Sequence, residues 1–511
     1  MAEPVVIDGE HLTLEDVERV ARDGPPVAIA GTADVQVRAG RAVVERMLAE
    51  GRTVYGVTTG FGELRNVKIE LHDITRLQQN LIRSHSVGVG EPFSEPVTRA
   101  IMLLRANTLA KGLSGIRPEP LRLLVDMLNR RVHPVIPQQG SVGASGDLAP
   151  LAHLALAMIG EGQVVLDGQT LPSQEAFRQA GLAPLTLEAK EGIALINGTP
   201  VMTAAGVLTL LDAERLSALA DIAGGMSVEA LKATDTAFDL RIHRSRPHAG
   251  QLACARNLLA LVRDSEIIAS HKDCPEVQDA YSLRCIPQVH GATKDALRYV
   301  RGVLEIEINA VTDNPMVFPD DHTALSGGNF HGQPVALALD FLGIAIAELV
   351  NISERRIERL VNPQLSRGLP PFLAAHSGLN SGFMIAQVVA AALVSENKLL
   401  ASPASVDSIP TSANQEDHVS MGPIAARKAM AILTNAQRVL AIEFLCAAQG
   451  LDFRLPLRPG IGTGAAYDTI RQAVPHLDDD RPLYEDIERM MRLITGGEIL
   501  GAVGKVVGTL A

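Results

Sequence analysis

Residues 140–150 hold the most informative pattern in the chain, because glycines stand at positions 140, 143 and 146 and Ser145 lies between Ala144 and Gly146. An apolar helical pattern follows, so a tight turn leading into a helix capped by Asp147 is one interpretation. A phosphate-binding loop would need a Lys-Ser or Lys-Thr end, which is absent. A serine-hydrolase elbow would need Gly where Asp147 stands. The turn and one chemical alternative stay open.

The chemical alternative is a condensation of the backbone with itself. The amide nitrogen of Gly146 can attack the carbonyl carbon of Ala144, because glycine has no side chain to block the approach. Loss of one water in ring closure and another from the Ser145 side chain gives a 4-methylidene-imidazol-5-one (MIO). Its exocyclic methylene is an electrophile that no standard side chain supplies. The tripeptide therefore predicts an autocatalytic cyclisation and a chemistry that captures amines.

A resemblance to a known family supports this alternative and spans nearly the whole chain, from the run Tyr-Gly-Val-Thr-Thr-Gly-Phe-Gly at residues 55–62 to Ala448. The sequence resembles the histidine, phenylalanine and tyrosine ammonia-lyase and aminomutase family, whose prosthetic group forms from the matching Ala-Ser-Gly. The resemblance implies an MIO made from Ala144, Ser145 and Gly146, with no metal. It also implies a homotetramer whose sites combine residues of several subunits.

The family pattern assigns a base and a carboxylate clamp. Tyr55 matches the general base, which takes a weakly acidic β-proton if nearby cations lower the pKa of its phenol. Arg284 matches the residue that pairs with the substrate carboxylate, a task suited to a bidentate guanidinium. We expect Tyr281 to be catalytic and Gln278 to bind substrate beside Arg284. Without the resemblance, Tyr55 would be packing and the Arg284 cluster a solvated loop.

Two further residues match positions around the prosthetic group. Asn197 matches a residue that hydrogen-bonds the prosthetic group and the substrate, although locally it could serve only to turn the chain before Gly198. Phe330 matches the aromatic residue that packs near the methylidene. We expect both to bind substrate. For Asn329 and His331, hydrogen bonds that structure their loop remain the better interpretation.

Two segments indicate the substrate. Ser84-His85 matches the histidine-specific branch, in which the His contacts the imidazole. The Gln-Glu-Asp-His run at residues 415–418 also matches that branch, and a Glu416 carboxylate facing a benzene ring would be desolvated without compensation. We therefore expect Glu416 to be catalytic, L-histidine to be the substrate, and trans-urocanate and ammonia to be the products. Ser86 departs from the Ala of many histidine-specific members, so a tyrosine ammonia-lyase or aminomutase stays the alternative.

The elements that must hold these residues are mainly helices. Hydrophobic residues make up 47% of the 511 positions and aromatic residues 3%, with no Trp, a composition that favours closely packed helices. Apolar positions at three- and four-residue steps predict long helices over residues 333–360, 382–400 and 423–451, and hence an elongated bundle. We expect a mainly α, fumarase/aspartase-like fold. Its N-terminal region, residues 1–200, would carry the prosthetic group and base loop, and residues 201–511 the bundle.

Charge and cysteine content argue against several classes of partner. The formal net charge is −12 and no Lys/Arg run is present, so neither nucleic acid nor a membrane is expected as a partner. The longest uncharged apolar stretch, residues 381–395, is shorter than the ~20 residues of a membrane-spanning helix. The four cysteines, which lack CxxC spacing and the density of a disulfide scaffold, are Cys254, Cys274, Cys285 and Cys446. We expect a cytoplasmic protein that acts on a small molecule.

Overall fold

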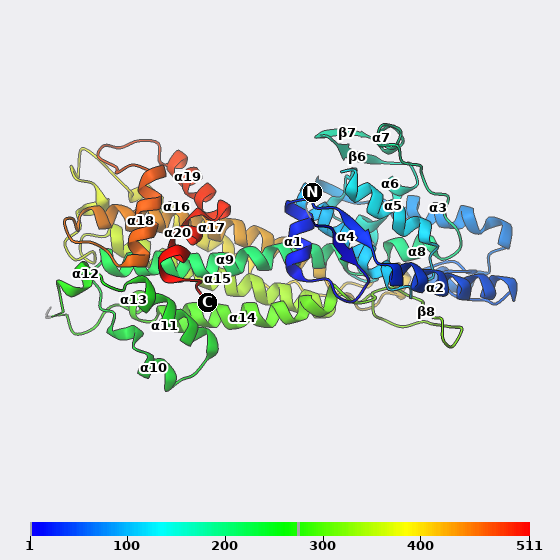
Figure 1. Ribbon diagram of the computed structural model, residues 1–511, viewed down its shortest axis with the longest axis horizontal. Helices are drawn as coiled ribbons and strands as arrows, with labels where there is room; N and C mark the ends of the chain where they lie inside the picture. Colours follow the sequence, from blue (N-terminus) through cyan, green and yellow to red (C-terminus); the bar gives the residue numbers. More distant parts are fainter. Residues whose placement is uncertain (1–2, 273–275) are drawn as a thin grey trace. The chain divides into compact units, whose positions relative to one another are not determined.

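The computed structural model describes residues 3–272 and 276–511, so Cys274 lies outside the described residues. Helices dominate the described chain (Figure 1), which confirms the prediction of a mainly α fold. The chain forms two compact units. Unit 1 comprises Met1–Thr209, Arg301–Asp340 and Pro403–Arg427; unit 2 comprises Leu210–Val300, Phe341–Ser402 and Lys428–Ala511. The expected N-terminal region falls within unit 1, and the expected boundary at residue 200 stays a prediction.

The three long helices expected from apolar periodicity are present. They are α15 (Gln333–Val361), α16 (Met384–Leu400) and α17 (Gly422–Asp452). Two more long helices are α9 (Pro200–Ala230) and α14 (Ile286–Glu307). Apolar residues are spread around the whole of α9, as in a helix that is buried on all sides.

Unit 1 holds all the strands among the described residues, and they form small sheets. β1 (Val5–Ile7) pairs parallel with β2 (Val27–Ile29), and the remaining pairs are antiparallel: β3 (Val89–Pro92) with β5 (Pro137–Gln139), β6 (Gln163–Leu166) with β4 (His133–Pro134) and β7 (Gln169–Pro172), and β8 (Met316–Phe318) with β9 (Thr323–Leu325). Its shorter helices are α1 (Leu14–Arg22), α2 (Gly31–Ala49), α3 (Ile74–His85), α4 (Glu95–Ala110), α5 (Pro118–Asn129), α6 (Leu148–Met158), α7 (Ser173–Ala180) and α8 (Glu191–Ile196). Single 3₁₀ turns are η1 (Gly62–Asn66), η2 (Leu71–Asp73) and η5 (Ser412–Asn414).

The described residues of unit 2 form helices joined by loops, with no strand among them. Its shorter elements are η3 (Thr236–Phe238), α10 (Leu240–Arg244), α11 (Ala249–Leu261), α12 (Glu266–Ala269), α13 (Tyr281–Arg284), η4 (Pro371–Leu373), α18 (Ile461–Ala473), α19 (Leu483–Gly496) and α20 (Glu498–Val507). Helix α19 ends at Gly497, whose φ of 81° places it in the left-handed region that favours glycine at a helix C-terminus.

Helix α4 forms the core of unit 1, and it carries polar residues that position the site. Its residues 97–110 are all buried, including Arg105. Buried polar groups need hydrogen-bond partners. Arg105 finds them in the carbonyl oxygens of Ala194, at 2.9 Å, and Asn197, at 2.7 Å. The helix thereby fixes the turn that follows α8.

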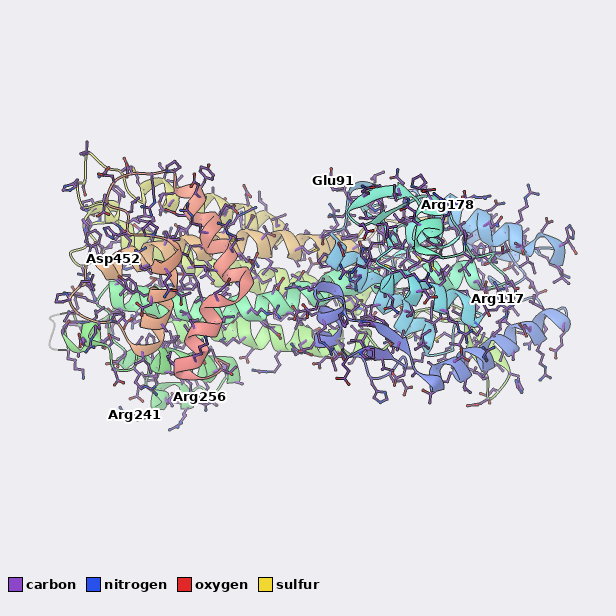
Figure 2. All side chains as sticks on the ribbon, turned by 45° about the horizontal axis from the view of Figure 1, so that its top comes forward. Glu91, Arg117, Arg178, Arg241, Arg256 and Asp452 are labelled. Atoms are coloured by element: carbon purple, nitrogen blue, oxygen red, sulfur yellow. The ribbon has the colours of Figure 1, made fainter. Side chains whose placement is uncertain are left out.

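Exposed charged side chains pair with one another over the surface. Arg178 and Arg241, both labelled in Figure 2, bind Glu175 and Asp239 at 2.6 and 2.7 Å. Such exposed pairs stabilise a fold only slightly, because water and salt screen them. Arg117, also labelled, differs in that its partner Glu191 is fully buried.

Helices α15 and α17 are long and apolar enough to cross a membrane, by length and composition alone. Their apolar windows are 67% and 72% buried within the protein. Core helices of other proteins meet the same criterion, so this pattern is weak evidence for a membrane span.

Candidate functional site

A cavity of about 610 Å³ in unit 1 collects many of the expected site residues. It is lined by the loop before η1, the start of α6 and the loops at residues 326–331 and 412–418. The expected site residues on its wall are Tyr55, His85, Ala144, Ser145, Asn197, Phe330 and Glu416. Gly146 is the next residue along the chain, and it lines a smaller cavity that shares Ser145 and Glu416.

The backbone at Gly146 admits no side chain. Gly146 has a φ of 72°, and a Cβ built on it would lie 2.0 Å from the carbonyl oxygen of Gly198. Gly198 is equally confined, because its Cβ would lie 2.5 Å from Oγ1 of Thr312. The Asp147 amide donates to the Gly198 oxygen at 2.7 Å. The backbone at Gly146 therefore packs directly against Gly198, in the turn that follows α8.

Two donors converge on the carbonyl oxygen of Ser145. Nδ2 of Asn197 donates at 2.9 Å and the amide of Gly198 at 3.2 Å. Paired donors of this kind stabilise negative charge that develops on an oxygen. Arg105 holds the backbone oxygen of Asn197, so the donors are fixed in advance.

Asp147 is fully buried beside the tripeptide; it stands at the N-cap of α6, as one interpretation of the sequence expected, but its side chain makes no capping hydrogen bond. Its Oδ2 instead accepts from the amides of Val201 and Met202 at 2.8 and 3.0 Å, at the start of α9. Its Oδ1 has no hydrogen-bond partner in the part of the chain that the structure describes. Burial raises the pKa of Asp147 to about 7, although these amides and Arg105 lower it.

Tyr55 lies in the cavity, and its environment in a single chain differs from the expected one. Its hydroxyl accepts from the amide of Gly62 at 3.2 Å. Burial raises the pKa of Tyr55 and Glu416 raises it further, whereas Gly62 and Arg65 lower it. The lowered pKa that a tyrosinate base requires is therefore not produced by this chain alone.

His85 and Glu416 both present hydrogen-bond acceptors. Nδ1 of His85 lies 2.9 Å from the carbonyl oxygen of Leu81 and 3.0 Å from Oγ of Ser84, whose hydroxyl itself donates to that carbonyl oxygen. The tautomer that donates from Nδ1 to the Leu81 oxygen leaves Nε2 as an acceptor. Burial lowers the pKa of His85, which favours its neutral form. The Glu416 carboxylate accepts from Oγ of Ser145 at 3.3 Å and from Oγ1 of Thr411 at 2.7 Å.

Gln278, Tyr281 and Arg284 do not line the unit 1 cavity. They belong to unit 2, where Gln278 and Arg284 line a second cavity of about 750 Å³. Tyr281 is 72% exposed, and the Arg284 guanidinium lies 4.7 Å from the centre of its ring. Nε of Arg284 is buried, and none of the residues described, 3–272 and 276–511, gives it a hydrogen-bond partner.

The sequence analysis missed Arg105 and Thr411. Arg105 had a usable signal, because a charged residue inside an otherwise apolar helix must find buried partners. Thr411 had none, since its contact with Glu416 depends on the conformation of the loop between them.

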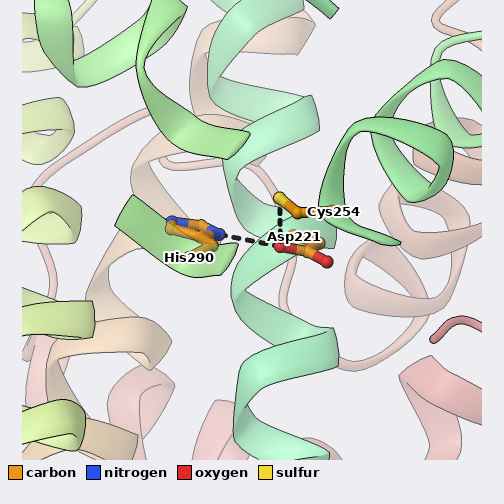
Figure 3. A group of neighbouring side chains, drawn as sticks. All are labelled: Asp221, Cys254 and His290. Atoms are coloured by element: carbon orange, nitrogen blue, oxygen red, sulfur yellow. Dashed lines mark hydrogen bonds and ion pairs between the residues drawn. The ribbon is translucent and has the colours of Figure 1, made fainter. Parts of the chain in front are cut away.

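Unit 2 contains a group of buried side chains of the types that bind metals. Asp221, Cys254 and His290 place one ligand atom each within 4.8 Å of one another (Figure 3). Lys294 lies 3.2 Å from Asp221, and Arg356 lies 3.3 Å from His290. These cations already balance the carboxylate and would repel a divalent ion. We interpret the group as a structural network.

Known proteins resemble the chain along its whole length. A family model described as aromatic amino acid lyase matches residues 12–472. A protein named histidine ammonia-lyase from Alkaliphilus oremlandii is 57% identical over 98% of this chain and 99% of its own. The crystal structure of histidine ammonia-lyase from Trypanosoma cruzi is similar with a TM-score of 0.92 and 45% identity, covering 99% of this chain and 96% of that one. Tyrosine aminomutase from Streptomyces globisporus is similar with a TM-score of 0.94 and 40% identity over 99% of both chains. The chain belongs to the aromatic amino acid lyase family.

Proposed function

We propose that this chain is a histidine ammonia-lyase, which converts L-histidine to trans-urocanate and ammonia in the first step of histidine degradation. The observation that carries this proposal is that Ser145, His85 and Glu416 line one cavity. An imidazole has one N–H donor when neutral and two when protonated, so it can donate to one or both of these acceptors, whereas a benzene ring would leave both desolvated. The names of the full-length relatives agree with this substrate.

The prosthetic group that we propose is an MIO formed from Ala144, Ser145 and Gly146. The residues present fit it, because Gly146 stands where no Cβ can be accommodated. The group would supply an exocyclic methylene that captures an amine and turns it into a better leaving group. Asn197 and Gly198 donate to the oxygen of Ser145 and would draw electron density from the conjugated alkene. No metal is needed for this chemistry.

Tyr55 is the general base of the proposed reaction. In a single chain burial raises the pKa of Tyr55 more than Arg65 lowers it, and a second cation near the phenol would lower it further. Arg284 can supply that charge while it binds the substrate carboxylate, if a second copy of the chain brings it to the cavity. Tyr281 and Gln278 would accompany it, which places all the expected residues in one composite site.

We propose a homotetramer, the subunit number that the family resemblance implies; the shared site itself requires at least two copies. Helix α16 exposes Ile385, Val388 and Leu399 to 62%, 52% and 71%. Apolar side chains in such numbers on one helix mark a surface that another protein covers. Co-expression of an Arg284→Ala chain with a Ser145→Ala chain tests shared sites, because mixed oligomers regain intact sites only if each site takes residues from two copies. Restored activity is expected, and two inactive variants that stay inactive together would contradict the shared site.

The alternative, a tyrosine ammonia-lyase or aminomutase, draws on Ser86 and on the similarity to tyrosine aminomutase. Ser86 gives it little support. Its hydroxyl donates to the carbonyl oxygen of Ile82 at 2.8 Å, and Ser86 is not among the residues that line the cavity.

A cytoplasmic location is also part of the proposal. Cys254, Cys285 and Cys446 are free thiols, as expected in a reducing compartment.

The decisive experiment is incubation of the purified protein with L-histidine, L-tyrosine or L-phenylalanine, with product identification. Urocanate absorbance is expected from histidine alone, and coumarate or a β-amino acid would favour the alternative. Intact-protein mass should be lower than the encoded value by two molecules of water. Glu416→Gln should slow histidine turnover by about 10²- to 10³-fold, as loss of a positioned acid or base does. Ser145→Ala should abolish both histidine turnover and the loss of two water molecules from the protein mass.

A further inference from the structure

The chain between Thr411 and Glu416 makes a turn that L-amino acids rarely adopt. Ser412, Ala413 and Asn414 have φ values of 51°, 52° and 68°, so three consecutive residues other than glycine lie in the left-handed region. Strained turns persist only where the surroundings hold them, and they are frequent at functional sites.

Thr411 and Glu416 close this turn with their backbones and side chains. The amide of Thr411 donates to the carbonyl oxygen of Glu416 at 2.9 Å, and the amide of Glu416 donates back at 3.2 Å. Oγ1 of Thr411 donates to Oε2 of Glu416 at 2.7 Å. The turn also approaches the loop of the general base, since a Cβ on Gly62 would lie 2.7 Å from Oγ of Ser412.

The two oxygens of Glu416 accept from different hydroxyl groups, and ring formation would remove only one of these donors. Among the described residues, Oε1 accepts from the hydroxyl of Ser145 and Oε2 from the hydroxyl of Thr411. Formation of the proposed ring removes the Ser145 hydroxyl as water. Oε1 is then free to accept an N–H of the substrate, and Thr411 is the remaining side-chain donor that fixes the carboxylate.

We propose that Thr411 is the positioning residue for Glu416, and that its hydroxyl holds the carboxylate ready for the imidazole once the ring has formed. This inference rests on the proposed function. A glutamate has three rotatable side-chain bonds, so without this donor the carboxylate would sample several rotamers. Thr411 lines the smaller cavity with Ser145, but its hydrogen bonds among the described residues are to Glu416, so it acts through that residue.

The matched variants are Thr411→Val, which keeps the shape and removes the donor, and Thr411→Ser, which keeps the donor. Thr411→Val is expected to lower kcat/KM for histidine by about 10- to 100-fold, the loss typical of a hydrogen bond to a charged group. It should also weaken inhibition by imidazole-4-propionate, a probe with the imidazole and carboxylate but no amine, by about 5- to 30-fold. Thr411→Ser should stay within about threefold of the wild type on both measures.

A double-mutant cycle with Glu416→Gln tests whether Thr411 acts through Glu416. The combined Thr411→Val and Glu416→Gln chain should be no slower than Glu416→Gln alone, because residues that act as a unit are not additive. Unchanged kinetics of Thr411→Val, or losses that multiply in the double variant, would overturn the proposal.

Intact mass separates positioning from folding. A slow Thr411→Val chain that has lost two molecules of water supports the proposal, and one that keeps the encoded mass contradicts it. If the Val variant does not fold, Thr411→Ala is judged by the same criteria. A wild-type protein that leaves histidine unchanged would instead refute the proposed function, so the two failures are distinguishable.

Discussion

Two buried aspartates, Asp147 in unit 1 and Asp221 in unit 2, show how differently the same side chain can be held. Both are inaccessible to solvent. Asp221 accepts from His290 at 2.8 Å and from Asn257 at 2.8 Å, with Lys294 at 3.2 Å. Although burial would raise its pKa, these partners hold the pKa of Asp221 well below its usual range. Asp147 has two backbone amides and a distant guanidinium, and its pKa rises to about 7.

The surroundings of the two residues differ in the same way. In unit 2, the Glu443 carboxylate accepts from Arg356, Ser227 and Ser353, so a second buried charge is also fully paired. In unit 1, the described residues offer no hydrogen-bond partner to three buried polar atoms: Oδ1 of Asp147, Oδ1 of Asn197 and Nε of Arg105. Such atoms are rare in folded proteins, but they also occur in unit 2, as Oε2 of Glu229 does, so they do not by themselves mark a site. The comparison teaches that the two aspartates differ in pairing: Asp221 belongs to a fully paired network, whereas Asp147 keeps an unpartnered oxygen beside the tripeptide.

The largest effect is expected at Gly146, where an added Cβ would clash with the carbonyl oxygen of Gly198. Gly146→Ala places a methyl group against the Gly198 oxygen and should abolish ring formation, with turnover reduced by more than about 10³-fold because no other electrophile is available. Gly168→Ala is the matched control, since Gly168 also has a positive φ of 76° but no atom within 4 Å of the added Cβ. Intact mass and histidine turnover are measured for both. A ring-forming Gly146→Ala chain would show that the close approach to Gly198 is not required.

Asp221→Asn is expected to lower the free energy of unfolding, a smaller effect than the loss of turnover in Gly146→Ala. The change leaves Lys294 without its buried counter-charge, and removal of one member of such a pair destabilises a protein by about 3–5 kcal/mol. Urea unfolding of the variant gives the value. Asp239→Asn is the control, because the Asp239 pair with Arg241 is exposed and little change is expected. A similar midpoint for both variants would mean that the unit 2 network is not a structural one.

Much of the fold could be predicted from the sequence, because long stretches of periodic apolar residues have few alternatives. Helix α15 was expected over residues 333–360 and spans Gln333–Val361. Helix α16 was expected from residue 382 but begins at Met384. Gly382 has a φ of 55°, and a Cβ there would lie 2.4 Å from the Phe372 oxygen, so the chain still turns at that point. Such a tertiary contact leaves no periodic signal.

The candidate site was predictable from residue chemistry together with the family resemblance. The Ala144–Gly146 pattern offered a ring closure that the resemblance supported, and Glu416 matched the family's Gln-Glu-Asp-His run; both line the unit 1 cavities. Asp147 stands at the expected N-cap of α6, but its carboxylate binds the start of α9, 54 residues away, instead of the amides of its own helix. Thr411 was not identified, because three successive left-handed residues without glycine have no turn signature. Long-range contacts of this kind exist only in the folded chain.

The smallest expected effect is a pH dependence of stability that belongs to Asp147 and not to Asp221. An unfolded Asp titrates near pH 3.8, whereas folded Asp147 titrates at about 7. Between these values the folded chain keeps a proton that the unfolded chain releases, so stability falls as pH rises from about 4 to 7 and is constant above that. Asp221 has the opposite shift, and its contribution is lost only as the pH falls below the range of an ordinary Asp.

Melting temperatures between pH 5 and 8 measure the difference. The proton on Asp147 should lower stability toward pH 7 by on the order of 1–3 kcal/mol, at one pKa unit per ~1.4 kcal/mol. Buried Glu229, whose pKa is also raised to about 7, acts in the same direction, and buried His133, whose pKa is lowered to about 4, acts in the opposite one. The measured quantity is therefore the difference between the two curves: relative to the wild type, Asp147→Asn should gain stability as the pH rises from 5 to 7. Asp221→Asn should lower the whole curve and keep its slope, since its group does not titrate in this range. If Asp147→Asn leaves the slope unchanged, the proton on Asp147 is not what distinguishes the two aspartates, and the unpaired Oδ1 must be explained by geometry alone.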